Sequence, residues 1–267
     1  MSSETTTEPP APTRREQRAA GRSRARDVFY GVVGVIGELL ITLGVLLFAF
    51  LLWQLWWTDV VGNHAQAEIV AELPFEPVPT ATPSAGAPVG PVIAPPRRDE
   101  PPVMAEPPHA TTFATMQVPR WVGEPERPIS QGTDRATVLD VLGVGHYEGT
   151  AMPGGLGNFA VAGHRTTYAK PFNRVEELQV GDPLILKTTD NVWYVYRVTS
   201  TQIVPPSAID VIAPVPGDPG AVPTERMITL TTCHPMYSAQ ERFIVHGVLD
   251  YWAPTSDGIP AELAGGA

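Results

Sequence analysis

Cysteine is almost absent from this chain, because Cys233 is the only one in 267 residues. A single thiol excludes an intramolecular disulfide. An unpaired cysteine is either a small buried side chain without chemistry or a reactive nucleophile. Composition alone leaves both interpretations open.

The sequence also lacks the spacings that mark metal and phosphate sites. Its six histidines and one cysteine include no Cys-x-x-Cys or His-Glu-x-x-His pattern. The glycine-rich residues 154–157 have neither the lysine nor the strand-helix context of a phosphate-binding loop. We therefore expect no metal and no cofactor, while scattered carboxylates leave extracellular calcium binding open.

Basic residues are scarce after the first 30 positions. Six of the 18 Lys and Arg residues lie within residues 1–30, so the remainder holds 12 basic and 24 acidic residues. An acidic body has little with which to neutralise a phosphate backbone. This composition argues against a nucleic-acid-binding function.

Charge is nearly missing from residues 29–53, where Glu38 is the only charged side chain. Twenty-five helical residues rise roughly 37 Å, which is enough to cross a bilayer. Arginine-rich sequence precedes this stretch and acidic sequence follows it, so the positive-inside rule places the N-terminus in the cytoplasm. We therefore expect a single-pass protein of the cell membrane with an extracellular domain.

Alternatives remain for this apolar segment. Ala65-Gln66-Ala67 offers the pattern of a signal-peptide cleavage site, but the stretch is longer than a signal core and the site lies well beyond its end. Retention as an anchor is therefore favoured. Glu38 is either a functional carboxylate facing a partner helix or a side chain that reaches water in a plain anchor.

Proline marks the segment after the apolar stretch, with 12 prolines in residues 74–108. This composition is typical of an extended tether, and residues 60–73 before it suit a short helix. The chain thus divides into five predicted parts. They are a disordered cytoplasmic tail (1–28), an anchor helix (29–57), a juxtamembrane segment and linker (58–111), a β-domain (112–253) and a flexible C-terminal tail (254–267).

Short apolar runs rich in Val, Ile, Thr, Tyr and Trp alternate with turn residues throughout the β-domain, which predicts an all-β fold closed into a barrel. Proline at a first turn and three apolar residues on one face predict a short helix over 171–178. The expected strands are 138–144, 158–163, 184–188, 193–201, 227–232 and 243–249.

Cys233 ends one expected strand and Arg242 begins the next. A hairpin closed by residues 234–241 would place the two opposite each other. Positive charge beside a cysteine favours the nucleophilic thiolate, and a guanidinium can stabilise an oxyanion. A surface pairing of Arg242 with Glu241 or Asp250 is the alternative.

A thiol enzyme also needs an acid and base. His64 and His109 lie in the juxtamembrane and linker sequence, His234 belongs to a loop, and His246 is inside a strand. This leaves His146 and His164. His164 ends a strand as Cys233 does, so two strand ends could meet at one site, although separate strand ends need not meet.

These residues resemble the sortase family of cysteine transpeptidases, and within it class E of actinobacteria. The likeness spans residues 116–250 and includes an arginine nine positions after the cysteine. It is carried by Thr229-Leu230-Thr231-Thr232-Cys233, Gly145-His146-Tyr147, residues 157–165, Val118-Pro119-Arg120, Pro128-Ile129, residues 171–178 and Gly181-Asp182.

The resemblance implies a barrel of about eight strands with one or two short helices. It makes Cys233 the nucleophile that attacks a Thr-Gly bond in a C-terminal sorting signal, His164 the acid and base, and Arg242 the residue that steadies substrate and oxyanion. It also assigns substrate binding to Tyr147, Thr231 and Thr232. The implied partners are secreted proteins with a Leu-Pro-x-Thr-Gly or Leu-Ala-x-Thr-Gly signal and a peptidoglycan precursor amine.

Two other functions stay open, namely a pilin-polymerising sortase and a non-catalytic, membrane-tethered wall-binding domain with an inert Cys233. A papain-like hydrolase is disfavoured, because His164 precedes Cys233 in the chain. Some pilin-building sortases carry a lid with an Asp-Pro-Trp or Asp-Pro-Phe element. Residues 98–130 contain neither, which predicts an open site.

Overall fold

The computed structural model describes residues 14–80 and 90–265. A long helix, α1 (Arg14–Glu72), comes first. Its part from Val28 on is long and apolar enough to cross a membrane, by length and composition. The chain forms two compact units, Met1–Gln54 and Leu55–Ala267. Because α1 begins at Arg14, the tail expected over 1–28 is helical from that residue on, and residues 1–13 lie outside the described residues.

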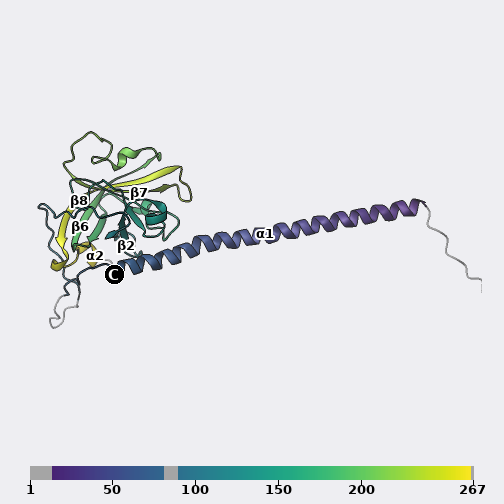
Figure 1. Ribbon diagram of the computed structural model, residues 1–267, viewed down its shortest axis with the longest axis horizontal. Helices are drawn as coiled ribbons and strands as arrows, with labels where there is room; N and C mark the ends of the chain where they lie inside the picture. The colour runs from purple at the N-terminus through teal and green to yellow at the C-terminus, as the bar shows by residue number, and fades with distance from the viewer. Residues whose placement is uncertain (1–13, 81–89, 266–267) are drawn as a thin grey trace, which may run out of the picture. The chain divides into compact units, whose positions relative to one another are not determined.

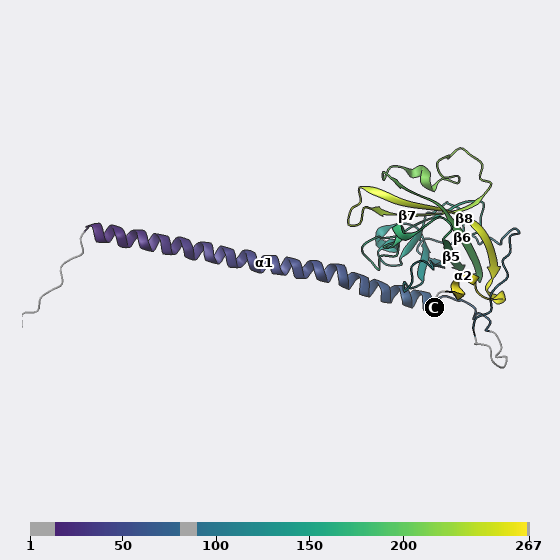
Figure 2. The ribbon, with the colours of Figure 1, turned by 180° about the vertical axis from the view of Figure 1, so that it is seen from behind.

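Within residues 14–80 and 90–265, eight strands close into a barrel in the order β1-β2-β3-β4-β7-β8-β6-β5 (Figures 1 and 2). The expectation of a closed all-β barrel is confirmed. The strands are β1 (Thr112–Gln117), β2 (Arg127–Gln131), β3 (Val144–His146), β4 (Gly157–Ala162), β5 (Pro183–Thr188), β6 (Val192–Val204), β7 (Arg226–His234) and β8 (Glu241–Pro254).

The strand expected over 138–144 is wrong. The chain there forms a π-helical turn, η1 (Arg135–Leu139), and only its end joins β3. Asp134 caps the turn by accepting a hydrogen bond from the backbone N–H of Thr137, and Val138 is fully buried. A β-branched, apolar sequence is compatible with a buried turn, so its composition alone misled the prediction. β1 and β2 were not among the expected strands.

The helix expected over 171–178 is only a 3₁₀ turn, η2 (Val175–Glu177). A second 3₁₀ turn, η3 (Ile209–Ile212), lies in the long connection between β6 and β7. The tail expected to be flexible from residue 254 is structured as far as residue 265, with η4 (Thr255–Asp257) and α2 (Ala261–Ala264). Ile259 and Leu263 cover an apolar cluster on the outside of the barrel, which is why this segment is ordered.

The proline-rich segment also differs from an extended tether, because residues 90–108 lie against the barrel. Ala94 is buried and donates its N–H to the carbonyl of Ile259. Tyr194 Oη donates to the Pro102 carbonyl at 2.7 Å, and Trp252 Nε1 donates to Asp99 Oδ1 at 3.1 Å. Barrel side chains thus supply the hydrogen-bond donors that a proline-rich segment lacks.

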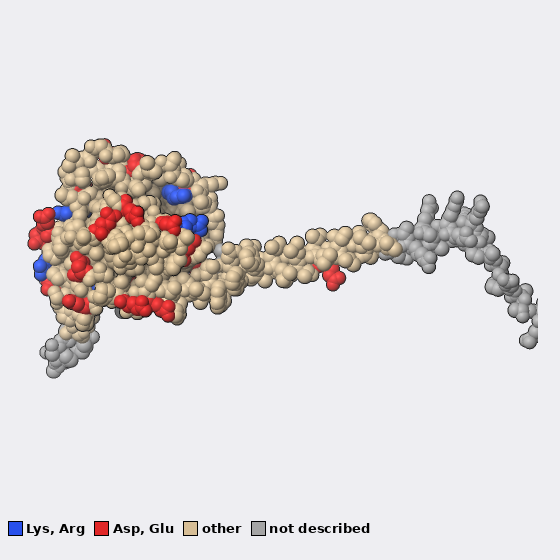
Figure 3. Space-filling model, in the orientation of Figure 1, with Lys and Arg blue, Asp and Glu red and all other residues tan. Residues whose placement is uncertain are grey.

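The barrel surface agrees with the acidic composition. In Figure 3, red acidic groups are spread over the visible face of the barrel, and blue basic groups are fewer there. The described part of α1 is almost entirely tan in the same view, as expected for a helix whose large side chains are exposed and apolar.

Substitution of a barrel-core residue tests this packing. Leu184 is fully buried in the central cluster, so Leu184→Ala should lower the free energy of unfolding by roughly 2–5 kcal/mol. The measurement is chemical denaturation of the full chain in detergent, followed by tryptophan fluorescence. Val222 is 84% exposed, so Val222→Ala should change that free energy by less than about 0.5 kcal/mol. Equal effects of the two substitutions would contradict this core.

His146 gives the barrel a predicted pH dependence. It is fully buried and stacked on Phe159, and burial lowers its pKa from 6.5 to about 4. The unfolded chain therefore binds a proton near pH 6.5, whereas the native chain does not until about pH 4. Stability should be complete above pH 6.5 and fall toward pH 4, by about 1.4 kcal/mol per unit of separation between the two pKa values.

The check is the free energy of unfolding measured between pH 7 and pH 4 for wild type and His146→Gln. The variant should show a shallower dependence. His64→Gln is the control, because the His64 side chain is 75% exposed and pairs with Glu68 on its own helix. If the free energy of unfolding of His146→Gln depends on pH as strongly as that of wild type, His146 binds its proton at the same pH in the native barrel as in the unfolded chain.

Candidate functional site

The two faces of β7 have different roles. Ile228 and Leu230 point into the barrel and belong to the central apolar cluster. Because side chains alternate along a strand, Thr229, Thr231 and Cys233 lie on the opposite, outer face. Cys233 is half-buried, so its thiol is not sealed in the core.

β8 fixes the position of Arg242. β7 and β8 are antiparallel neighbours, and their register pairs Cys233 directly with Arg242. The hairpin expected from the sequence is therefore confirmed. Directly opposed residues of an antiparallel pair have their side chains on the same face, so both lie on the outer face of the sheet.

β4 brings His164 to the same edge. β4 and β7 run parallel, and Ala162 pairs with Thr231. The pairing continues past the end of β4, because the N–H of Gly163 donates to the Thr231 carbonyl at 3.2 Å and Thr232 Oγ1 donates to the Gly163 carbonyl at 2.7 Å. His164 and Cys233 each follow this junction by one residue, in the same chain direction.

His164 has a carboxylate partner that the sequence did not reveal. Its Nε2 lies 2.6 Å from Asp140 Oδ1, and the side chains are 16% and 20% exposed. Asp140 follows the η1 turn, where the sequence predicted a strand, and no periodic pattern marks it. The Tyr168 ring packs against the His164 imidazole with a centroid separation of 5.2 Å.

Arg165 is a second residue that sequence reasoning did not single out. It is 3% exposed, and its Nη1 donates to the carbonyl of Cys233 at 3.3 Å and lies 3.2 Å from His234 Nδ1. Its Nη2 pairs with Glu176 at 2.8 Å, and the guanidinium lies over the Phe243 ring. The position of an arginine directly after His164 was the one available signal. This buried cation ties the end of β4 to the backbone of Cys233.

The guanidinium of Arg242 contacts the β7–β8 loop. Its Nη1 donates to the carbonyl oxygens of Ala239 and Glu241 at 3.0 and 2.9 Å. An open hollow of about 540 Å³ lies near the same loop, lined by Ile203 and Val204 of β6 and by Pro205, Pro235, Gln240 and Glu241.

The three expected substrate-binding residues lie near the same strand ends. Tyr147 Oη is 3.0 Å from Thr231 Oγ1, which also contacts the carbonyl of Val161 at 3.3 Å. Thr231 and Thr232 are both buried, and Thr232 is engaged with the Gly163 carbonyl as described above. The structure therefore brings Tyr147 and Thr231 together, while the Thr232 side chain serves the β4–β7 junction.

His246 lies in β8 and is held by hydrogen bonds within the sheet. Gln202 Nε2 donates to its Nε2, so its Nδ1 carries the proton and donates to Thr229 Oγ1 at 2.8 Å. Burial lowers the pKa of His246. Among residues 14–80 and 90–265 there is no group of three or more His, Cys, Asp or Glu residues that could hold a metal ion.

The chain was compared with known proteins. The family model "Sortase domain" matches residues 116–250. Sortase SrtE1 of Streptomyces coelicolor is 36% identical over 263 residues, which covers 96% of this chain and 68% of that protein. Sortase SrtE2 of the same organism is 27% identical and covers 86% of each chain.

Solved structures agree with these matches. The SrtA sortase from Actinomyces oris superposes with a TM-score of 0.60 at 43% identity, covering 63% of this chain and 96% of that one. Sortase E1 from Streptomyces coelicolor, solved with a tripeptide in its active site, gives a TM-score of 0.54 at 38% identity, covering 58% and 97%. By its fold, its sequence and the extent of both matches, this chain belongs to the sortase family of cysteine transpeptidases, and its relatives include class E sortases.

Proposed function

We propose that this protein is a membrane-anchored sortase that joins secreted proteins to the cell wall. Its substrates are proteins with a C-terminal Leu-Pro-x-Thr-Gly or Leu-Ala-x-Thr-Gly signal, and its acceptor is the amine of a peptidoglycan precursor. Cys233, His164 and Arg242 are the catalytic residues. The observation that carries the proposal is the strand pairing. It sets Cys233 directly opposite Arg242, and it pairs Ala162, two residues before His164, with Thr231, two residues before Cys233.

The first half of the reaction forms a thioester. Cys233 Sγ attacks the threonine carbonyl of the scissile Thr-Gly bond, and the carbonyl oxygen becomes an oxyanion. Arg242 donates hydrogen bonds to the substrate and to that oxyanion. As the carbon–nitrogen bond breaks, His164 gives a proton to the departing glycine amine. The threonine acyl group then remains on sulfur.

The second half transfers the acyl group to the acceptor. The incoming amine attacks the thioester carbonyl while His164 takes up its proton, and the carbon–sulfur bond breaks to restore the Cys233 sulfur. Water in place of the amine gives hydrolysis. A tripeptide occupies the active site of the related Sortase E1 structure, which supports peptide binding at the equivalent face here.

Asp140 and Arg165 prepare the site for these steps. Asp140 accepts a hydrogen bond from His164 Nε2, which holds the ring and leaves Nδ1 to exchange protons with the substrate. Arg165 holds the Cys233 carbonyl and so fixes the strand end from which the thiol projects. Tyr147 and Thr231, in contact with each other, line the face where the signal peptide binds.

The anchor is the helix over residues 29–57, with the N-terminus in the cytoplasm and the barrel outside the cell. The apolar composition of this helix and the arginines before it support this orientation. A non-catalytic wall-binding domain with a buried cysteine is disfavoured, because Cys233 is half-buried rather than enclosed.

Thioester trapping tests the function directly. The purified protein is incubated with signal peptides that differ at the second position, with an amine acceptor, and the adduct on Cys233 is measured by mass spectrometry. Cys233→Ala and His164→Ala should abolish transfer. Arg242→Lys should retain on the order of 1% of the activity, because a point charge does not reproduce the two-pronged guanidinium.

Arg135→Lys is the matched control for Arg242→Lys, because the Arg135 side chain is 70% exposed. Full activity in Arg242→Lys would remove Arg242 from the mechanism. A wild-type protein that forms no adduct with any signal peptide would contradict the sortase assignment of this site. Preference for a pilin lysine over a peptidoglycan amine would assign polymerisation instead.

Asp140→Asn tests the carboxylate behind His164. The amide can present an N–H where the oxygen should accept, so the ring loses its orientation and kcat should fall about 10-fold or more, with KM nearly unchanged. Steady-state transfer kinetics give both constants. Arg135→Ala removes only an exposed partner 3.6 Å from the same carboxylate and should have little effect. Equal kcat values for Asp140→Asn and wild type would show that His164 needs no partner.

A further inference from the structure

We propose that the C-terminal part of α1 is a positioning element for the catalytic histidine. Residues 59–66 of this helix, named here the clasp, hold the loop 165–170 that follows His164. The inference rests on the proposed function of His164. Its residues act through the loop and do not touch the reacting atoms. All the contacts involved lie within the compact unit Leu55–Ala267.

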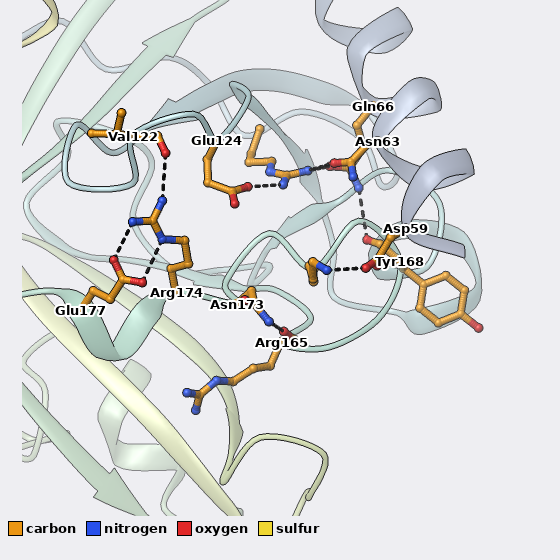
Figure 4. Close-up of polar contacts among 12 residues, drawn as sticks. Asp59, Asn63, Gln66, Val122, Glu124, Arg165, Tyr168, Asn173, Arg174 and Glu177 are labelled. Carbon is orange, nitrogen blue, oxygen red and sulfur yellow. Dashed lines mark hydrogen bonds and ion pairs between the residues drawn. The ribbon is translucent and has the colours of Figure 1, made fainter. Parts of the chain in front are cut away.

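The loop held by the clasp has a demanding backbone. Tyr168, Ala169 and Lys170 are three consecutive non-glycine residues with positive φ, at 54°, 63° and 38°. L-residues rarely adopt this conformation, and several together persist only where their surroundings hold them. The two ends of the loop are tied to each other, since Asn173 Nδ2 donates to the carbonyl of Arg165 at 2.8 Å (Figure 4). The middle of the loop is contacted by α1.

One clasp contact is an ion pair. Asp59 Oδ2 lies 2.6 Å from Lys170 Nζ, and the Asp59 side chain is only 13% exposed. A partly buried carboxylate is weakly hydrated, so losing its partner costs more than at an exposed site. The pair therefore fixes one end of the strained segment to the helix.

A second contact leads directly to the catalytic ring. Gln66 is 3% exposed, and its Nε2 donates to the Tyr168 carbonyl at 3.4 Å. In Figure 4, Gln66 and Asn63 point from the helix toward the barrel, and Tyr168 lies below them. The Tyr168 ring is the one that packs against His164. Gln66 thus holds the backbone of a residue whose side chain borders the imidazole.

A third contact is a close approach at Gly62. A Cβ built on Gly62 would lie 2.9 Å from the backbone nitrogen of Ala169 and 3.1 Å from its Cβ. Ala169 is itself fully buried. Glycine therefore lets the helix backbone pack directly on the loop backbone. A side chain there would have to push the loop away.

The helix is itself fixed to the barrel, so it can serve as a support. Arg127 of β2 is 4% exposed and donates to Asn63 Oδ1 at 2.6 Å and to Gln66 Oε1 at 3.2 Å. Arg127 also forms an ion pair with Glu124, at 2.8 Å. Burial lowers the pKa of Arg127, so these amide oxygens compensate for part of its lost hydration. The clasp is therefore anchored independently of the loop that it holds.

The critical test is Gly62→Ala, compared with Gly44→Ala. Alanine favours helix over glycine at both positions, but Gly44 has no heavy atom within 4 Å of the added Cβ. Full chains in detergent are mixed with saturating signal peptide, and thioester formation on Cys233 is followed in a single turnover. The amplitude counts folded protein, and the rate reports positioning.

Gly62→Ala should form as much thioester as wild type and should need the same peptide concentration for its half-maximal rate. Its maximal rate should fall about 3- to 10-fold, because a displacement of a few tenths of an ångström matters at a reacting group. Gly44→Ala should match wild type in all three quantities. A wild-type rate in Gly62→Ala would overturn the proposal, and so would a loss confined to amplitude.

Exchanging the charges of Asp59 and Lys170 provides a second test, which does not require either glycine variant to fold. Asp59→Lys and Lys170→Asp should each slow thioester formation, and the double variant should recover to within about 3-fold of wild type. Glu68→Gln is the control on the same helix, because Glu68 is exposed and pairs with His64. Single variants at the wild-type rate would also overturn the proposal.

Hydrogen exchange tests the clasp independently of the proposed function. Amides of residues 165–170 should exchange faster in Gly62→Ala and Asp59→Lys than in wild type, whether or not any thioester forms. Faster exchange with an inactive wild type would refute the sortase site but not the contact. Unchanged exchange and unchanged rates in an active protein would refute the clasp alone.

Discussion

The pairing of three neighbouring strand ends is the constraint on which the site depends. β7 lies between β4, which runs parallel to it, and β8, which runs antiparallel. Backbone hydrogen bonds set both registers, so a slip of one residue in either strand would turn the relevant side chain to the wrong face. The sheet therefore sets the positions of Cys233 and Arg242, whereas His164 lies just beyond the end of β4 and depends also on its contacts with Asp140 and Tyr168.

The charged groups behind the site come from segments far apart in the chain. Asp140 follows η1, Arg165 follows β4, and Glu176 belongs to η2. Asp140 contacts His164 just after β4, whereas Arg165 and Glu176 contact Cys233 and His234 at the end of β7. Arg165 is almost completely buried, and a buried guanidinium is tolerated only when its partners are fixed. The segments that supply these partners are short turns with buried anchors. The structural ordering of these turns is therefore linked to the placement of Cys233 and His164.

The sequence was informative where structure is local and periodic. The β7–β8 hairpin and the pairing of Cys233 with Arg242 follow from alternating side chains and loop length, and the barrel follows from the density of short strands. The role of Asp140 was not accessible, because it depends on a turn that folds back toward β4. Likewise, the docking of residues 90–108 depends on donors such as Tyr194 and Trp252, which lie some 90 to 150 positions away. A hydrogen bond between two polar atoms that are far apart in the chain produces no periodic pattern in the sequence.

The docking of the proline-rich segment changes what its length means. Residues 59–66 and 90–108 both contact the barrel, so the chain between them begins and ends on the same body. Such a connection is a closed loop, and doubling its length costs only about 0.6 kcal/mol of closure entropy. Its many prolines therefore do not act as a rigid spacer between the helix and the barrel. A change in the length of that stretch would alter this loop and leave the contacts of residues 59–66 with the rest of their compact unit in place.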